Sequence, residues 1–156
     1  MLPNGQPLWQ KGTPQSMQRL ACAFSFSSIV SSIISEGIPY KIIYHIVFEN
    51  KVKLLLSEEI IEEYLSIPGR EKFKKFPDFK INAEFIISNM IDIGFKVKPG
   101  QKLQIAKDPD DDKFLELAQE SKADYLVTGN IKDFGVLQFN STKILTPKMF
   151  WDEFNK

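Results

Sequence analysis

Cysteine and histidine are almost missing from this chain of 156 residues, since each occurs once. A single thiol, Cys22, excludes an intramolecular disulfide and a zinc cage built from cysteines, and it suits a reducing compartment. The single histidine, His45, lies in a mostly apolar segment with helical spacing, so we expect it to have a structural and not a catalytic role. The composition therefore predicts a cytoplasmic protein without disulfides.

The sequence also lacks a net charge and a long hydrophobic run. Its 20 basic residues balance its 20 acidic residues. Non-specific binding to nucleic acid depends on Lys and Arg at phosphates, so this balance argues against a protein that coats nucleic acid, although one local patch could hold a short RNA. The uncharged stretch from Leu20 to Ser35 resembles a signal peptide superficially. It is rich in serine and shorter than the about 20 apolar residues of a membrane span. We expect no membrane association.

Several motifs of nucleotide-binding proteins and hydrolases are missing as well. There is no GxxxxGK loop to hold a phosphate and no GxSxG turn to carry a nucleophilic serine. The acidic run DPDDDK fails the pattern of a calcium-binding loop because Lys113 stands where that pattern needs glycine. A phosphatase on a similar sheet would need a DxDxT-like motif, which the sequence does not contain.

What the chain does contain is an alternation of short apolar runs with segments of helical spacing. Residues 1–18 are rich in Pro, Gly, Gln and Asn and predict a loose tail, which leaves residues 19–156 for the folded domain. We expect strands at 20–24, 51–56, 95–97, 124–128 and 143–145, with helices between them. This alternation predicts an α/β fold with a central parallel sheet of four to five strands, covered by helices on both faces.

The expected helices have recognisable ends. Ser57 is expected to cap a helix with two glutamates in its first turn, where the helix dipole favours anions. Thr146 is expected to cap the last helix, which Pro147 opens. For the helix that stops at Gly94 we expect an inner face made of Phe85, Ile86, Met90 and Ile93.

Acidic residues follow several of the expected strands. In an open parallel sheet, ligands bind outside the carboxyl ends of the strands. Carboxylates gathered there repel one another, so such a cluster usually holds a hard divalent cation. Mg²⁺ or Mn²⁺ held in this way can activate a water for cleavage of a phosphodiester. Each group of acids also has a plainer interpretation, since the glutamates at 58–63 could form a solvated helix face and residues 108–112 a capped loop.

A basic and aromatic segment lies between two expected helices. Lys72, Lys74 and Lys75 alternate there with Phe73 and Phe76. Such a segment could hold RNA through contacts to phosphates and stacking of bases. The alternative is an ordinary amphipathic surface segment.

Four segments together resemble one known family. They are KVKLLLSEEIIEEYL (51–65), DPDDDKFLELA (108–118), ADYLVTGNIKDF (123–134) and ILTPKMFWDEF (144–154). In order and spacing they are similar to PIN domains, specifically to toxin components of toxin–antitoxin pairs related to VapC-like toxins, over roughly residues 29–154. The resemblance implies a three-layer α/β/α sandwich. It also implies a ribonuclease that depends on Mg²⁺ or Mn²⁺, is often a homodimer, and is held in check by a cognate antitoxin protein.

The resemblance also implies roles for individual residues. It places metal-binding, catalytic carboxylates at Glu63, Asp111 and Asp133. Asn130 would assist in binding the metal. Asp108 and Thr128 would support the site.

The sequence departs from this family near its beginning. Family members carry an aspartate that binds the metal and an asparagine two residues later, and these positions fall on Ser25 and Ser27. A serine cannot supply the negative charge, so affinity for the ion and the rate of cleavage should both fall. Either the gene has degenerated or the start of the sequence is altered. Two hypotheses therefore stay open: a toxin endoribonuclease with impaired activity, or a catalytically inactive PIN module that binds an antitoxin-like protein or RNA.

Overall fold

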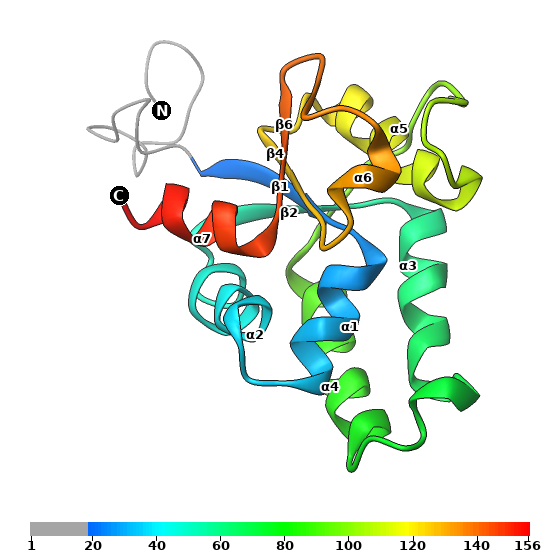
Figure 1. The fold of residues 1–156 in the computed structure, drawn as a ribbon, viewed down its shortest axis with the longest axis vertical. Helices are drawn as coiled ribbons and strands as arrows, with labels where there is room; N and C mark the ends of the chain where they lie inside the picture. Colours follow the sequence, from blue (N-terminus) through cyan, green and yellow to red (C-terminus); the bar gives the residue numbers. More distant parts are fainter. Residues whose placement is uncertain (1–18) are drawn as a thin grey trace, which may run out of the picture.

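The computed structural model describes residues 19–156, and the tail expected at residues 1–18 lies outside the described residues. Within 19–156, none of the helices has the length and apolar character to pass through a membrane. The chain alternates strands and helices as expected, and Figure 1 shows the helices lying above and below a central sheet.

The central sheet has six strands in the order β3-β2-β1-β4-β6-β5. The strands are β1 (Leu20–Phe24), β2 (Val52–Leu56), β3 (Phe95–Lys96), β4 (Tyr125–Val127), β5 (Gln138–Phe139) and β6 (Thr142–Leu145). All neighbouring strands are parallel except β5 and β6. The expected α/β class is confirmed, but four to five strands were too few. The additional strand is β5, which turns back at Asn140, whose φ of 53° suits a tight hairpin.

The helices cover both faces of this sheet. They are α1 (Phe26–Ile34), α2 (Ile38–Ile42), α3 (Glu58–Ser66), α4 (Phe79–Ile93), α5 (Asp112–Ser121), α6 (Ile131–Phe134) and α7 (Pro147–Phe154). Four short segments with other helical geometries lie between these helices. They are the π-helical turn η3 (Ile43–Val47) and the 3₁₀ turns η4 (Ile67–Gly69), η5 (Glu71–Phe73) and η6 (Pro109–Asp111). Helix α5 packs on β1, β2 and β4, whereas α1, α2 and α7 pack together on the opposite side (Figure 1).

The predicted helix ends are confirmed. Ser57 Oγ accepts a hydrogen bond from the Ile60 amide, and Thr146 Oγ1 accepts one from the Met149 amide at 3.1 Å. The predicted inner face of α4 is partly wrong, because Phe85 is 53% exposed. The buried stripe of α4 is Phe79, Ala83, Ile86, Ile87 and Met90. Phe85 lies beside this stripe and contacts the rings of Tyr44 and Phe48 instead.

The two residues that occur once in the sequence both lie away from any cluster of catalytic groups. Cys22 is fully buried in β1, and burial raises the pKa of its thiol, which therefore stays protonated and unreactive. His45 is exposed on η3, with its Nδ1 3.5 Å from Glu49 Oε2. The expected structural role of His45 stays a prediction, since its side chain is exposed.

Candidate functional site

The carboxyl ends of β1 and β4 lie side by side and begin the candidate site. Backbone hydrogen bonds continue one residue beyond the strands, from the Ser25 amide to the Val127 carbonyl at 2.9 Å and from the Thr128 amide to the Leu145 carbonyl at 2.9 Å. The buried hydroxyl of Tyr64 donates to the Phe24 carbonyl, which fixes α3 over the end of β1. Glu63, which precedes Tyr64, is thereby brought to this edge of the sheet.

Carboxylates from three separate segments surround Asp111 at this edge. Asp111 ends η6 directly before α5. Its pKa rises to about 6, first because of burial and then because of the negative charges of Asp108, Asp133 and Glu63. Glu63 comes from α3 and Asp133 from α6. We call Glu63, Asp108, Asp111 and Asp133 the carboxylate cluster. Its members are close enough for their charges to act on one another.

The carboxylate cluster does not form a finished metal cage. Across residues 19–156, no group of three or more His, Cys, Asp or Glu side chains is already positioned to hold a metal ion. Glu63 Oε2 accepts a hydrogen bond from Lys113 Nζ, in a pair whose side chains are only 16% and 15% exposed. The carboxylate oxygens around Asp111 are nevertheless the type of ligand that hard divalent cations prefer, and a cation would offset the repulsion between them.

Serine hydroxyls occupy the place where the resemblance implies the first acid. Ser25 is 3% exposed, and its Oγ lies 3.0 Å from Ser27 Oγ and 3.4 Å from Ser28 Oγ. Ser28 Oγ donates to the Val127 carbonyl at 3.1 Å, and Ser27 Oγ accepts from the Gly129 amide at 3.1 Å. These neutral hydroxyls join the start of α1 to the loop after β4. They add no negative charge to the site.

The supporting residues shape the loops that carry the acids. Thr128 is buried, and its Oγ1 accepts a hydrogen bond from the Asn130 amide at 3.1 Å. The Asn130 carbonyl then accepts from the Asp133 amide at 3.0 Å, which starts α6. Asp108 Oδ1 accepts from the Asp110 amide at 3.0 Å and so caps η6 directly before Asp111.

Two acids of the DPDDDKFLE run have a different task, which the sequence analysis missed. Asp112 Oδ1 accepts from the amides of Ile105 and Ala106 at 3.0 and 2.8 Å, and Glu116 Oε2 accepts from the Leu103 amide at 2.9 Å. Both side chains are buried and hold the loop of residues 97–107 against α5. Their spacing of four residues, which puts them on one helix face, was the available signal.

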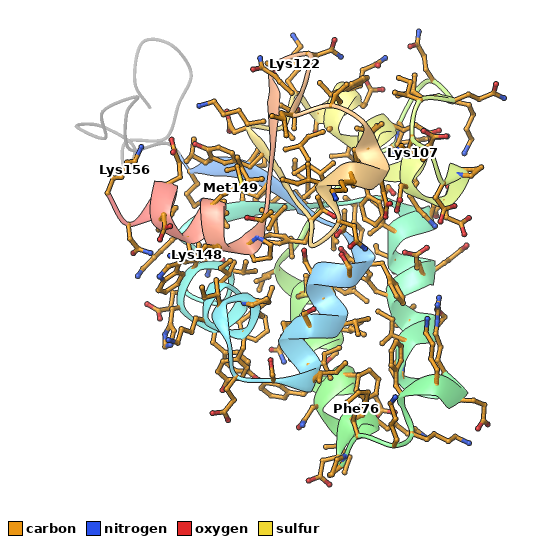
Figure 2. All side chains as sticks on the ribbon, in the orientation of Figure 1. Phe76, Lys107, Lys122, Lys148, Met149 and Lys156 are labelled. Carbon is orange, nitrogen blue, oxygen red and sulfur yellow. The ribbon has the colours of Figure 1, made fainter. Side chains whose placement is uncertain are left out.

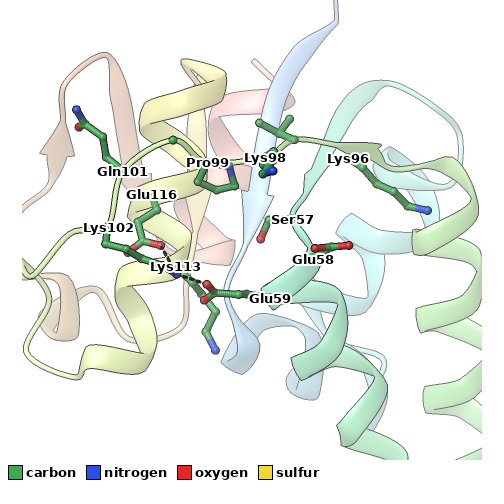
Figure 3. Close-up of a pocket in the computed structure, with 12 residues that line it drawn as sticks. Ser57, Glu58, Glu59, Lys96, Lys98, Pro99, Gln101, Lys102, Lys113 and Glu116 are labelled. Atoms are coloured by element: carbon green, nitrogen blue, oxygen red, sulfur yellow. Dashed lines mark hydrogen bonds and ion pairs between the residues drawn. The ribbon is translucent and has the colours of Figure 1, made fainter.

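A pocket of about 560 Å³ adjoins the carboxylate cluster. Its walls come from the first turn of α3, from residues 96–102 and from α5 (Figure 3). Lys102 pairs with Glu59 and lies 3.7 Å from Glu116, on the side of the pocket opposite Lys96. Lys113 lines the same pocket while it contacts Glu63, so it connects the pocket with the cluster.

The three lysines predicted as weak RNA contacts separate in the structure. Lys74 Nζ pairs with Glu71 at 2.7 Å, and Lys75 lies over the ring of Phe76, 5.4 Å from its centroid. Figure 2 shows Phe76 at the end of the molecule opposite Lys107, whose backbone bonds to Asp133. Lys72 lies over Phe26, the residue that follows Ser25. Of the three, Lys72 is therefore the one connected to the candidate site.

The fold and the acids at the carboxyl edge of its sheet define a class of α/β domains with nuclease-like architecture. The PIN domain family matches residues 27–132, which is more than half of the chain, and the chain belongs to this family. PIN domains are generally nucleases and usually use divalent metals. An uncharacterised protein of Methanocaldococcus jannaschii is 29% identical over 81% of this chain and 86% of that protein. No match to a solved structure was found.

The region that matches the family includes some of the candidate residues and excludes others. The matched region contains Glu63, Asp111 and Asn130. It begins two residues after Ser25 and ends one residue before Asp133. The roles of all these residues as ligands or catalysts stay predictions.

Proposed function

We propose that this protein is an endoribonuclease that depends on Mg²⁺ or Mn²⁺ and acts as the toxin of a type II toxin–antitoxin pair. The observation that carries the proposal is the effect of Asp108, Asp133 and Glu63 on the pKa of Asp111, which rises to about 6. Acids from α3, α6 and the segment of η6 that crowd one edge of a sheet are unfavourable unless a cation or substrate offsets their charge. The family supplies the reaction class, since PIN domains are generally nucleases.

Each residue of the site has a distinct proposed role. Glu63, Asp111 and Asp133 provide carboxylate oxygens for the ion, and Asn130 provides an amide oxygen. Held by these residues, Mg²⁺ or Mn²⁺ would supply activation of a water and stabilisation of the charge that develops on the phosphodiester. Lys113 Nζ orients Glu63 and, from the wall of the pocket, lies where it can neutralise a phosphate oxygen. Ser25 offers a hydroxyl without charge, so we expect the ion to bind more weakly than with a fourth carboxylate.

The experiment compares cleavage of a labelled RNA by the wild type and by Asp111→Asn in the presence of Mn²⁺. We expect the wild type to cleave slowly and Asp111→Asn to be inactive. Asp110→Asn is the matched control, because it removes the same negative charge at the neighbouring position. The side chain of Asp110 is exposed. Cleavage that survives Asp111→Asn at the wild-type rate would contradict the proposed site.

A second candidate function is a PIN module that binds an antitoxin-like protein or RNA without cleavage. It is favoured by Ser25, which is 3% exposed and bonded to other hydroxyls where the resemblance implies a ligand. The deciding variant is Ser25→Asp, alone and with Ser27→Asn. A large gain in Mn²⁺-dependent cleavage over an inactive wild type would identify a disabled nuclease scaffold. Equal cleavage by the wild type and by Ser25→Asp would support the first candidate function, the endoribonuclease.

The biological setting is proposed from the same resemblance. We propose a cytoplasmic homodimer that a cognate antitoxin protein inhibits. The test is to express the chain together with the product of the neighbouring open reading frame. Light scattering then gives the mass of the free chain and of any complex. A monomer that forms no complex with that product would contradict this setting.

A further inference from the structure

A group of aromatic rings and cations lies where the start of α1 meets the segment after α3, and it has no role in the chemistry described so far. The Arg70 guanidinium lies over the Phe26 ring, 4.5 Å from its centroid. Lys72 Nζ lies 5.6 Å from the same centroid and 5.1 Å from that of Phe73. The two rings are 6.5 Å apart. We call Phe26, Arg70, Lys72 and Phe73 the platform.

The platform is joined to α1, which follows Ser25, and to α3, which carries Glu63. Phe26 is the first residue of α1 and follows Ser25 directly. Arg70 Nη2 donates to Ser66 Oγ at 3.0 Å, at the end of α3, and Ser66 Oγ donates to the Glu63 carbonyl. Helix α3 has nine residues, so it is about 13 Å long at 1.5 Å per residue. The pocket with Lys96 lies at its start, Glu63 along it, and the platform beyond its end.

The charges of the platform are free to meet a ligand. In the part of the chain that the structure describes, neither Arg70 nor Lys72 has a carboxylate oxygen within 4 Å, whereas Lys74 in the same segment pairs with Glu71. Cations held over rings cost little conformational freedom when they bind an anion, because the rings already restrict them. Arg19 and Lys53 lie over the ring of Phe95 in a similar way, but only Arg70 and Lys72 lie over the ring that follows Ser25.

We propose that the platform binds one nucleotide of a single-stranded RNA next to the scissile bond. The base stacks on the outer face of the Arg70 guanidinium, which Phe26 supports from below, and Lys72 contacts the adjacent phosphate. Bases of a duplex are already stacked and paired, so a single strand is the form that presents a free face. This inference rests on the proposed function only for the presence of RNA at the edge of the sheet.

The experiment measures binding of a fluorescein-labelled 12-nucleotide RNA by anisotropy in EDTA, where no cleavage occurs. We expect Arg70→Ala to weaken binding about 10-fold, as loss of one stacking contact does. Lys74→Ala is the matched control and should change affinity less than about 2-fold, because an exposed pair contributes little. Binding unchanged by Arg70→Ala, or weakened equally by Lys74→Ala, would overturn the proposal.

Two further measurements separate stacking from plain charge and the platform from the nuclease. Arg70→Lys keeps the charge but loses the planar surface, so we expect it to restore less than half of the lost affinity, and full restoration would overturn stacking. Loss of binding in Arg70→Ala supports the platform even if the wild type cleaves nothing. Cleavage with an unchanged KM in Arg70→Ala would contradict the proposed role of the platform and would still support the proposed nuclease.

Discussion

Asp111 is the residue whose titration reports on the carboxylate cluster. Its pKa rises from 3.8 to about 6 because of burial and the neighbouring acids. Between these two values the folded protein binds more protons than the unfolded chain, so the free energy of unfolding falls as pH rises through this window. At neutral pH without a cation, the carboxylate of Asp111 therefore destabilises the fold.

The first prediction follows from that sign. Asp111→Asn should raise the free energy of unfolding at pH 7 in EDTA by about 1 kcal/mol, a value discounted because the side chain is partly exposed. Below about pH 4 the gain should vanish, because the wild-type side chain is then protonated as well. Urea unfolding at both pH values gives the comparison, with Asp92→Asn on the exposed side of α4 as a control. A gain that persists at low pH would contradict a cause based on charge.

The second prediction concerns the pair of Lys113 and Glu63. Removing one partner of a mostly buried pair leaves an unpaired charge, so Lys113→Met should cost about 3 kcal/mol of unfolding free energy in EDTA. Glu63→Gln in the same protein should recover most of this loss, since the unpaired charge is then removed. Urea unfolding of the single and double variants measures both effects, with Lys80→Met as an exposed control. Absence of recovery would show that the pair is not coupled.

At the scale of elements, some features were predictable because their signals are local. A hydroxyl before a helix, as at Ser57 and Thr146, satisfies amides within the same turn, so a few neighbouring letters predict it. The outward Phe85 and the hairpin of β5 were missed because they depend on what packs from elsewhere. The acids at 63, 111 and 133 were expected at one edge from the family resemblance and from the rule that the carboxyl ends of parallel strands share an edge. The contact of Lys113 with Glu63 depends on how α3 lies against α5, which no local pattern contains.

The third prediction belongs to the loop of residues 97–107. Asp112 holds this loop by accepting two backbone hydrogen bonds, from Ile105 and Ala106. Asp112→Ala leaves both amides without that partner and should cost about 1–3 kcal/mol. Hydrogen exchange at these two amides should accelerate more than exchange in β1. The control is Glu120→Ala on the same helix, and equal acceleration in both variants would contradict the assigned role.

For the molecule as a whole, the balance of 20 basic and 20 acidic residues sets how RNA binding should depend on salt. A protein without net charge attracts RNA only through local contacts, here Lys72 and a lysine of the pocket. Two phosphate contacts on a single strand give a slope near −1.4 for log K against log salt, so affinity should fall about 7-fold between 50 and 200 mM salt. Anisotropy titrations in EDTA across this range measure the slope. A slope near −5 would require a broad basic surface and would contradict binding of RNA through these few contacts.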